Sequence, residues 1–235
     1  MTLQEVMAEL EQMGSEQTKK VLMKHGAREP FFGVKVGDLK KIVKKVKKDH
    51  ELSIALFNTG NSDAMYLAGL IADEKKISGD QLQDWAEKAY WYMLSEYTVA
   101  WVAAESRFGH ELGMEWIEAD EENIASAGWA TLANYLAITQ NEELDLQEID
   151  DLLECISKTI KYAPNRVRYA MNGFVIAAGS YIPELTNRAI EIAEKIGKVE
   201  VEMGGTACKV PSAPEYIKKV KDAGKLGKKK KVARC

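Results

Sequence analysis

The sequence has few of the residues that build disulfide frameworks or metal sites, and it lacks a long apolar run. Its 235 residues include three cysteines and three histidines, widely spaced and without CxxC or HExxH patterns. This composition excludes a disulfide scaffold and a histidine-rich metal site, so we expect no metal, no cofactor and a cytoplasmic protein. No apolar run reaches the roughly 18–20 residues of a membrane span, and the N-terminus does not resemble a secretory signal. We therefore expect no membrane partner.

Strand patterns are also scarce, whereas helical periodicity extends over most of the chain. Only residues 199–203 alternate in polarity, and they precede two glycines, so an extended loop is favoured over a sheet. Residues 65–72 and 171–178 are apolar over most of their helical surface, which indicates helices that lie between two neighbours. We predict an all-α fold, a HEAT-like α-solenoid of stacked antiparallel helix pairs in a single domain over residues 1–223. A compact helical bundle is the alternative.

Positive charge gathers in a short segment of a chain whose net charge is −4. Seven lysines fall between residues 35 and 48, with one acid among them, Asp38. Leu39, Ile42 and Val46 recur at helical spacing, so they share one face and leave the rest to lysine. A cationic helix on an acidic protein suggests a local site for a polyanion, although a merely solvated helix face has the same pattern. The lysines of this cluster are Lys35, Lys40, Lys41, Lys44, Lys45, Lys47 and Lys48.

The end of the chain is basic as well. Residues 218–234 contain eight lysines and one arginine against a single acid, Asp222. From residue 224 onward the composition is of low complexity, so we expect residues 224–235 to form a basic tail with little fixed structure. Such a tail assists non-specific DNA association, and a solubilising role is the alternative.

Several segments resemble one known family. Phe32-Gly33-Val34-Lys35, followed by Leu39-Lys40-Lys41, resembles the aromatic-Gly-Val/Ile-basic turn and basic helix of the AlkD-like DNA alkylation repair family, within the HEAT-like repeat DNA glycosylase superfamily. Residues 165–174 and 203–211 look like segments of a bacterial branch of that family. The resemblance implies a concave, positively charged surface that cradles duplex DNA. It also implies release of N3- and N7-alkylated purines by hydrolysis of the N-glycosidic bond, with no metal and without flipping the base into a pocket.

The residues that carry catalysis in the active members are altered here. Their Ser-Trp-Trp-Asp-Thr-Val-Asp segment falls on residues 95–101, so that Tyr97 replaces a tryptophan and Trp101 stands at the catalytic aspartate. Trp129 lies beside the position of the family's arginine. Tyr97, Trp101 and Trp129 are thus the candidates for a stacking surface at the lesion, with core packing as the alternative. Because no Trp-x-x-x-Asp is present, DNA binding is better supported than base excision.

Two arginines complete the predicted interface. Arg166 and Arg168 open a late apolar helix in a chain with only six arginines, and a guanidinium there can hold a phosphate through two hydrogen bonds. Pairing with nearby acids is the alternative. The predicted DNA-binding residues are therefore these two arginines and the seven lysines of residues 35–48.

The function that these residues favour is a DNA-binding protein of the DNA alkylation repair type, with N-glycosylase activity left open. We expect it to be a monomer whose partner is duplex or damaged DNA. One alternative is a non-catalytic protein that binds DNA damage or an unusual DNA structure. Another is a HEAT-type scaffold for protein interactions, in which the lysines are incidental.

Overall fold

Helices account for all the regular structure of residues 1–234, which are the residues that the computed structural model describes. This confirms the predicted all-α fold. The α-helices are α1 (Leu3–Met13), α2 (Glu16–Lys24), α3 (Val36–Val46), α4 (His50–Phe57), α5 (Ser62–Ile71), α6 (Gly79–Lys88), α7 (Ala100–Glu105), α8 (Gly109–Trp116), α9 (Glu122–Ile138), α10 (Leu146–Thr159), α11 (Asn165–Tyr181), α12 (Thr186–Ile196) and α13 (Ala213–Asp222). Three further helical segments are η1 (Met93–Val99), η2 (Asn141–Glu143) and η3 (Pro183–Leu185).

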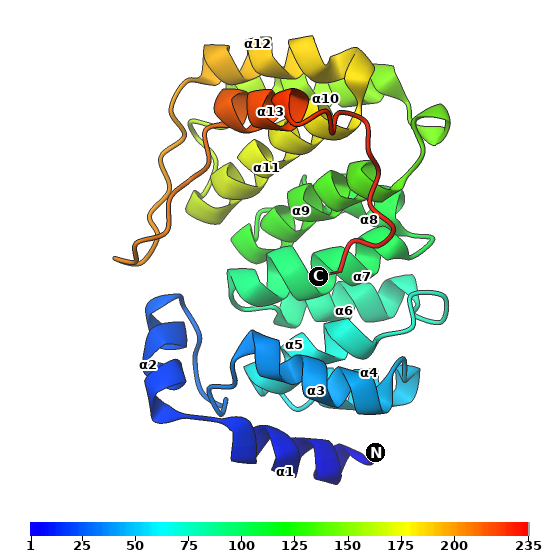
Figure 1. Ribbon diagram of the computed structural model, residues 1–235, viewed down its shortest axis with the longest axis vertical. Coiled ribbons are helices and arrows are strands. Elements are labelled where there is room, and N and C mark those ends of the chain that lie inside the picture. Colours follow the sequence, from blue (N-terminus) through cyan, green and yellow to red (C-terminus); the bar gives the residue numbers. More distant parts are fainter. Residues whose placement is uncertain (235) are drawn as a thin grey trace.

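The helices stack in two rows rather than forming a compact bundle (Figure 1). In one row α3 packs against α5, then η1 with α7, then α9, α11 and α13 follow in order. The second row holds α4, α6, α8, α10 and α12, and each of these helices packs against a neighbour in the first row. The stack runs from α1 at one end to α12 at the other (Figure 1), as expected of a solenoid of antiparallel pairs.

Local sequence signals explain where these helices begin and which face they bury. Side chains of Thr2, Ser15, Asn61 and Ser78 accept hydrogen bonds from first-turn amides at the starts of α1, α2, α5 and α6. Tryptophans contribute to the core, in which Trp85, Trp91 and Trp116 are buried. In α3, Leu39 and Ile42 are buried and the lysines are exposed, as their spacing predicts.

Three parts of the chain differ from the sequence-based expectations. Residues 93–99 form a π-helix, η1, where a regular α-helix was expected. Residues 213–222 form α13, which the lysine-rich sequence did not suggest, because its helix buries only Ala213 and Ile217. Residues 224–234 are not a free tail in the structure but return along the first row to α7 (Figure 1). Their contacts are described below.

Glycine sets the spacing between neighbouring helices at one point that can be tested. A Cβ at Gly128 in α9 would lie 2.7 Å from the backbone nitrogen of Ile117, just after α8. At Gly173 in α11 a Cβ would meet nothing within 4 Å. The first position therefore requires glycine, whereas the second does not.

We expect Gly128→Ala to destabilise the protein by about 1–3 kcal/mol, because a backbone contact cannot move aside as a side chain can. Gly173→Ala is the matched control, also helical, and should be neutral or stabilise by up to about 1 kcal/mol. Urea unfolding of both variants measures the difference. Equal midpoints for the two would contradict the close packing of α8 and α9.

Candidate nucleic-acid interface

A buried carboxylate fixes the turn that precedes the lysine helix. Asp63, at the start of α5, accepts hydrogen bonds from the backbone N–H groups of Phe32, Gly33 and Val34 at 2.6, 2.9 and 3.2 Å. Gly33 has φ +79°, and a Cβ there would lie 2.7 Å from the backbone of α2. These contacts hold the Phe-Gly-Val-Lys turn against α2 and α5, and they determine where α3 begins.

All seven lysines of residues 35–48 are exposed, but they differ in their partners. Lys41 pairs with Asp38, Lys45 with Glu9 on α1, and Lys48 with Glu74 in the loop after α5. Within residues 1–234 the other four lysines make no ion pair: Lys35, Lys40, Lys44 and Lys47. Four ammonium groups on or next to one short helix are therefore available to an outside anion.

The C-terminal segment, residues 224–234, binds across the C-terminal ends of four helices of the first row. The backbone N–H of Gly227 donates to the carbonyl of Ser180 in α11, at 3.0 Å. At α9, the N–H of Lys230 donates to Ala137 O at 2.8 Å, and Lys229 Nζ donates to Leu136 O at 2.7 Å. The last carbonyls of a helix lack partners within the helix and carry partial negative charge. A cationic segment satisfies them, which explains why this lysine-rich sequence has a fixed course.

Arg234 fastens the end of that segment between α5 and α7. Its guanidinium donates to both Glu105 and Glu74, at 2.5 and 2.6 Å, and to the carbonyl of Ala72 at 2.8 Å. Glu105 also accepts from the backbone N–H groups of Ala233 and Arg234. Burial alone would raise the pKa of Glu74, but Lys48 and Arg234 hold that pKa below its ordinary value. Glu74 thus joins the lysine helix α3 to the C-terminal segment.

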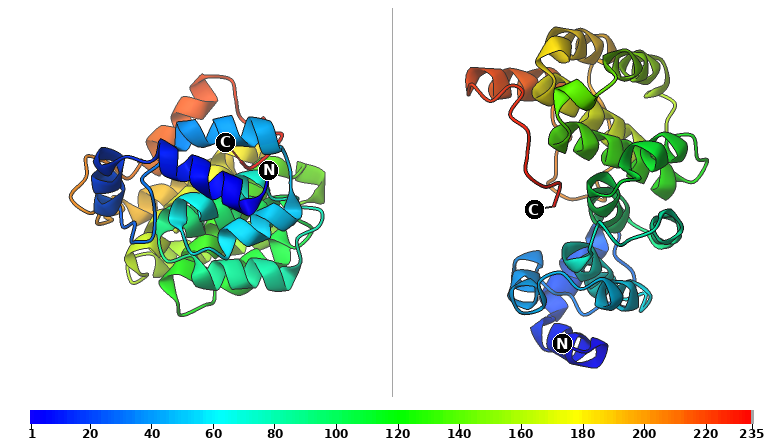
Figure 2. Two further views of the ribbon diagram at one scale, coloured as in Figure 1. Left: turned by 90° about the horizontal axis from the view of Figure 1, so that it is seen from below. Right: turned by 90° about the vertical axis from the view of Figure 1, so that its right-hand side faces the viewer.

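The elements that carry these lysines, namely α3, α13 and residues 224–234, lie on one side of the stack (Figure 2). Figure 2 shows α3, α13 and the returning segment on the same side when the molecule is turned. We call this side the lysine face, defined by Lys35, Lys40, Lys41, Lys44, Lys45, Lys47, Lys48, Lys218, Lys219, Lys221, Lys225, Lys228, Lys229, Lys230 and Lys231. It is assembled from sequence segments about as far apart as the chain allows.

Arg166 is committed to a buried ion pair near the middle of the stack. Its guanidinium donates to both oxygens of Glu96 in η1, at 2.7 and 2.5 Å. The rings of Tyr92 and Tyr169 lie 4.3 and 4.4 Å from the guanidinium carbon, so the cation is flanked by two aromatic faces. Burial raises the pKa of Glu96 to about 7, against the opposing effect of Arg166. The acid-pairing alternative therefore describes Arg166 in this structure.

Arg168, two residues further along α11, takes another direction. It lines a hollow with Lys161 and Lys198 beside the ends of α10 and α12, which belong to the second row. Its Nε is buried and has no hydrogen-bond partner among the described residues. The two arginines are thus not brought together, and the structure gives neither of them a place among the α3 lysines. Their phosphate contact stays a prediction.

The aromatic candidates separate in the same way. Tyr97 is half-buried and its ring meets Trp101 edge to face, with centroids 5.4 Å apart. Trp101 is only 4% exposed and also packs on Tyr66, and Trp129 is 2% exposed against Phe174. The expectation of a stacking surface is corrected for the two tryptophans, because neither offers a free ring face. Burial raises the pKa of Tyr97 to about 12, so its hydroxyl stays protonated at neutral pH.

The two carboxylates nearest to this centre in the sequence are both engaged. Glu96 pairs with Arg166, and Glu105 pairs with Arg234. An oxocarbenium-like sugar is stabilised by a carboxylate that faces it, and these two face cations of the protein itself. Nor do the described residues contain a cluster of three side chains able to hold a metal ion. In this structure neither carboxylate is free to face a sugar.

Sequence reasoning missed the residues that hold the C-terminal segment. Arg234 lies 129 positions from Glu105 and 160 from Glu74, and no local pattern reports such a pairing. It also missed Tyr92 and Tyr169, whose spacing from Arg166 is meaningful only after η1 and α11 are packed together. The sequence held one signal for Arg234. It is an arginine at the end of a tract of lysines, and arginine is the residue suited to bidentate pairing with a carboxylate.

The comparisons with known proteins agree with this architecture. The model of the DNA alkylation repair enzyme family matches residues 6–217. The chain belongs to this family. A solved structure described as "A new family of proteins related to the HEAT-like repeat DNA glycosylases with affinity for branched DNA structures" is similar over 100% of both chains, with a TM-score of 0.91 and 40% identity. The HEAT-like repeat fold and the family resemblance drawn from the sequence are thereby confirmed.

Two curated relatives cover nearly the whole chain as well. Uncharacterized protein Lmo0209 of Listeria monocytogenes is 34% identical over 230 residues, which are 95% of this chain and 99% of the relative. Uncharacterized protein Lin0241 of Listeria innocua is 33% identical over 227 residues, 94% of this chain and 98% of the relative. Over residues 1–234, no helix combines the length and apolar character that a bilayer crossing requires.

We expect Arg234→Ala to destabilise the protein by about 3 kcal/mol, because removing one partner of a buried ion pair leaves the other charge unsatisfied. At this chain length the melting temperature should fall by about 6–12 °C. Hydrogen exchange at the Lys230 amide, which donates to α9, should accelerate. Lys231→Ala is the control because Lys231 is exposed. Equal melting temperatures would show that Arg234 does not anchor the segment.

Arg166→Met should produce a loss of stability that grows with pH. Without its partner, Glu96 resists ionisation further, so its pKa rises above the value of about 7 in the wild type. A carboxyl whose folded pKa is raised is penalised only where it must ionise. The loss should therefore approach about 3–5 kcal/mol at pH 8 and be smaller at pH 5. Urea unfolding at both pH values measures it.

The double variant Glu96→Gln/Arg166→Met provides the control, since no charge remains to be buried. Its stability should vary less between pH 5 and pH 8 than that of Arg166→Met. A loss in the single variant that is the same at both pH values would contradict the assigned role of Glu96.

Proposed function

We propose that this protein binds DNA through the lysine face, with a preference for branched or distorted DNA, and that it does not excise bases. The observation that carries the proposal is the joining of α3 to the C-terminal segment through Glu74, which accepts from both Lys48 and Arg234. Two basic segments that are remote in sequence thus become one surface. The affinity for branched DNA reported for the structure that is 40% identical supports the preferred substrate.

Electrostatics favours DNA binding at the lysine face over binding at the protein's other surfaces. The net charge is −4, so an evenly charged molecule would repel DNA at long range. At physiological salt, charges further apart than about 8 Å are largely screened, and the local lysines therefore decide the interaction. Lys35, Lys40, Lys44 and Lys47 have no acidic partner among residues 1–234, and each can neutralise a phosphate without first breaking an ion pair.

We propose that the protein does not excise bases because its nearest carboxylates are already paired. Glu96 and Glu105 are held by arginines, and the tryptophans at the family's catalytic positions are buried. A lesion placed beside Tyr97 would meet a neutral phenol. We further propose that the protein works as a monomer in the cytoplasm, where exposed free thiols such as those of Cys155 and Cys208 remain reduced.

The deciding experiment pairs a binding titration with a base-release assay. A four-way junction, a linear duplex of the same length and an alkylated duplex are titrated at several salt concentrations. We expect the junction to bind most tightly, the affinity to fall steeply with salt, and no free alkylated purine to appear under single-turnover conditions. Base release would establish a glycosylase instead, and binding that is absent or insensitive to salt would favour a protein scaffold.

The double variant Lys40→Gln/Lys44→Gln should lower the slope of log affinity against log salt by about 1.8, because each lost phosphate contact contributes about 0.9. The matched control is Lys88→Gln/Lys158→Gln, which removes two exposed lysines from α6 and α10 in the second row. The control should retain the wild-type slope. If both double variants lose affinity equally, the contact is not specific to the lysine face.

A further inference from the structure

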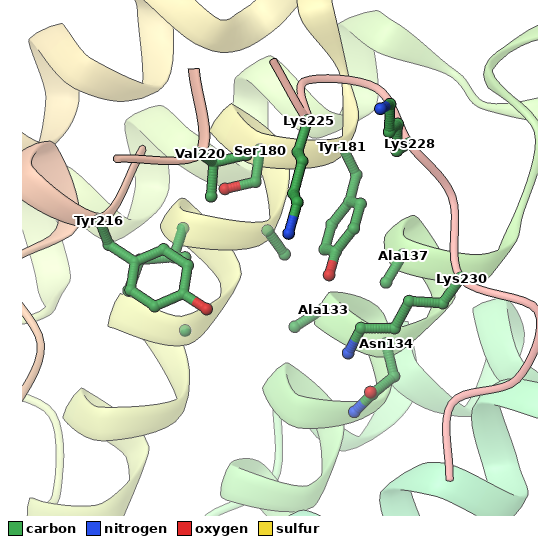
Figure 3. Close-up of a pocket in the computed structure, with 13 residues that line it drawn as sticks. Ala133, Asn134, Ala137, Ser180, Tyr181, Tyr216, Val220, Lys225, Lys228 and Lys230 are labelled. Carbon is green, nitrogen blue, oxygen red and sulfur yellow. The ribbon is translucent and has the colours of Figure 1, made fainter. Parts of the chain in front are cut away.

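A hollow of about 390 Å³ opens on the lysine face, between α9, α11, α13 and the C-terminal segment (Figure 3). Its volume falls within the range of about 300–1,000 Å³ that small ligands occupy. One wall is Lys225, Lys228 and Lys230, which reach it because residues 224–234 cross the ends of α9 and α11. The hollow therefore exists only while that segment is in place.

Several polar groups converge on this hollow, and one of them, the amide of Asn134, already donates to the carbonyl of Ala130 at 2.8 Å. In Figure 3 the ammonium groups of Lys225 and Lys230, the hydroxyl of Tyr181 and the amide of Asn134 point toward the same open space. Neither lysine makes an ion pair within residues 1–234. Ser180, only 3% exposed, lines the hollow, and its hydroxyl oxygen is buried with no hydrogen-bond partner. Buried polar groups are nearly always satisfied, so this hydroxyl is available for a hydrogen bond to a ligand.

The floor of the hollow is apolar and built from small side chains. Ala133, Ala137 and Ala177 line it with methyl groups, and Gly173 lies at its open part, where a Cβ would meet nothing within 4 Å. Tyr181 and Tyr216 add aromatic rings at the sides, and Lys230 lies 5.9 Å from the centre of the Tyr181 ring. A planar apolar group fits such a floor, and an anion fits between the two ammonium groups.

We propose that this hollow binds one nucleotide unit, with its base over the alanine floor beside Tyr181 and its phosphate between Lys225 and Lys230. A nucleotide joins a planar base to a phosphate, so it matches both halves of the site. The inference rests on the proposed function, because an unpaired nucleotide at a branch or strand end of bound DNA can supply this unit. A free nucleoside monophosphate has the same chemistry.

The test fills the hollow with the variant Gly173→Trp. Because a side chain at this helical position meets open space, the fold should be kept, which thermal unfolding checks. Three ligands are compared: a duplex with a short 5′-phosphorylated flap, a linear blunt duplex, and deoxyadenosine monophosphate. We expect Gly173→Trp to weaken binding of the flap or of the mononucleotide at least about tenfold, and to leave binding of the blunt duplex within about twofold of wild type.

Gly173→Ala is the size control and should bind all three ligands as the wild type does. Lys225→Gln/Lys230→Gln is a second variant, which does not fill the hollow. Because both lysines also belong to the lysine face, it should weaken binding of the blunt duplex somewhat, and binding of the flap or of the mononucleotide by several-fold more. If Gly173→Trp loses affinity for the flap alone, the source of the nucleotide is a DNA strand. If it loses affinity for the mononucleotide alone, the natural ligand is a free nucleotide.

The inference is overturned if folded Gly173→Trp binds the flap and the mononucleotide as tightly as wild type, or if wild type binds neither more tightly than blunt duplex. An equal loss for flap and blunt duplex would also overturn it, while leaving the lysine face as a DNA-binding surface. Conversely, mononucleotide binding by a protein that binds no DNA would uphold the hollow and refute the proposed function.

Discussion

The carboxylate of Glu105 is the group on which the lysine face depends. It accepts hydrogen bonds from the backbone N–H groups of Ala233 and Arg234 and from the guanidinium of Arg234, so that chain direction and side chain are fixed together. Burying such a pair is costly unless the remaining donors are satisfied. Here Glu74 and the carbonyls of Gly69 and Ala72 accept the other guanidinium hydrogens. The segment is anchored at Arg234 and hydrogen-bonded to α9 and α11 along its course. Its backbone is therefore fixed, and its lysines start from defined positions.

A second buried pair, between Glu96 and Arg166, determines what the middle of the stack can do. The resemblance to active glycosylases places their carboxylate in η1 or α7, and this chain has its nearest carboxylates there. Each of them already neutralises an arginine, and two tyrosine rings cover one of those arginines. The electrostatic stabilisation that a departing base would need is thus used within the protein. The same framework of helix pairs therefore supports DNA binding, with the two nearest carboxylates already committed to arginines of the protein.

Features that depend on neighbours within a helical turn could be predicted from the sequence, and features that depend on distant charges could not. The caps at Ser15 and Asn61, the apolar face of α3 and the burial of Trp85 follow from spacing alone. The π-helix η1 and the course of residues 224–234 do not. In η1, Thr98 packs against Gly69 of α5, where a Cβ would lie 2.7 Å from the Thr98 methyl group. This contact joins two elements that are remote in sequence, so local spacing does not report it. For the C-terminal segment, composition describes an isolated chain, whereas four helix ends supply the acceptors that order it.

Those four helix ends also explain why a basic segment is required at this place. Helices α5, α7, α9 and α11 run parallel within their row, so their C-terminal carbonyls present partial negative charge along one edge. An uncovered edge of this kind would repel a phosphate backbone. Residues 224–234 satisfy part of these carbonyls with N–H and ammonium groups and leave Lys225, Lys228 and Lys230 at the surface. The segment thus places positive charge along the edge and, by crossing it, builds the wall of the hollow. A protein whose net charge is −4 thus carries local positive charge at the place where the helix dipoles would otherwise oppose an anionic ligand.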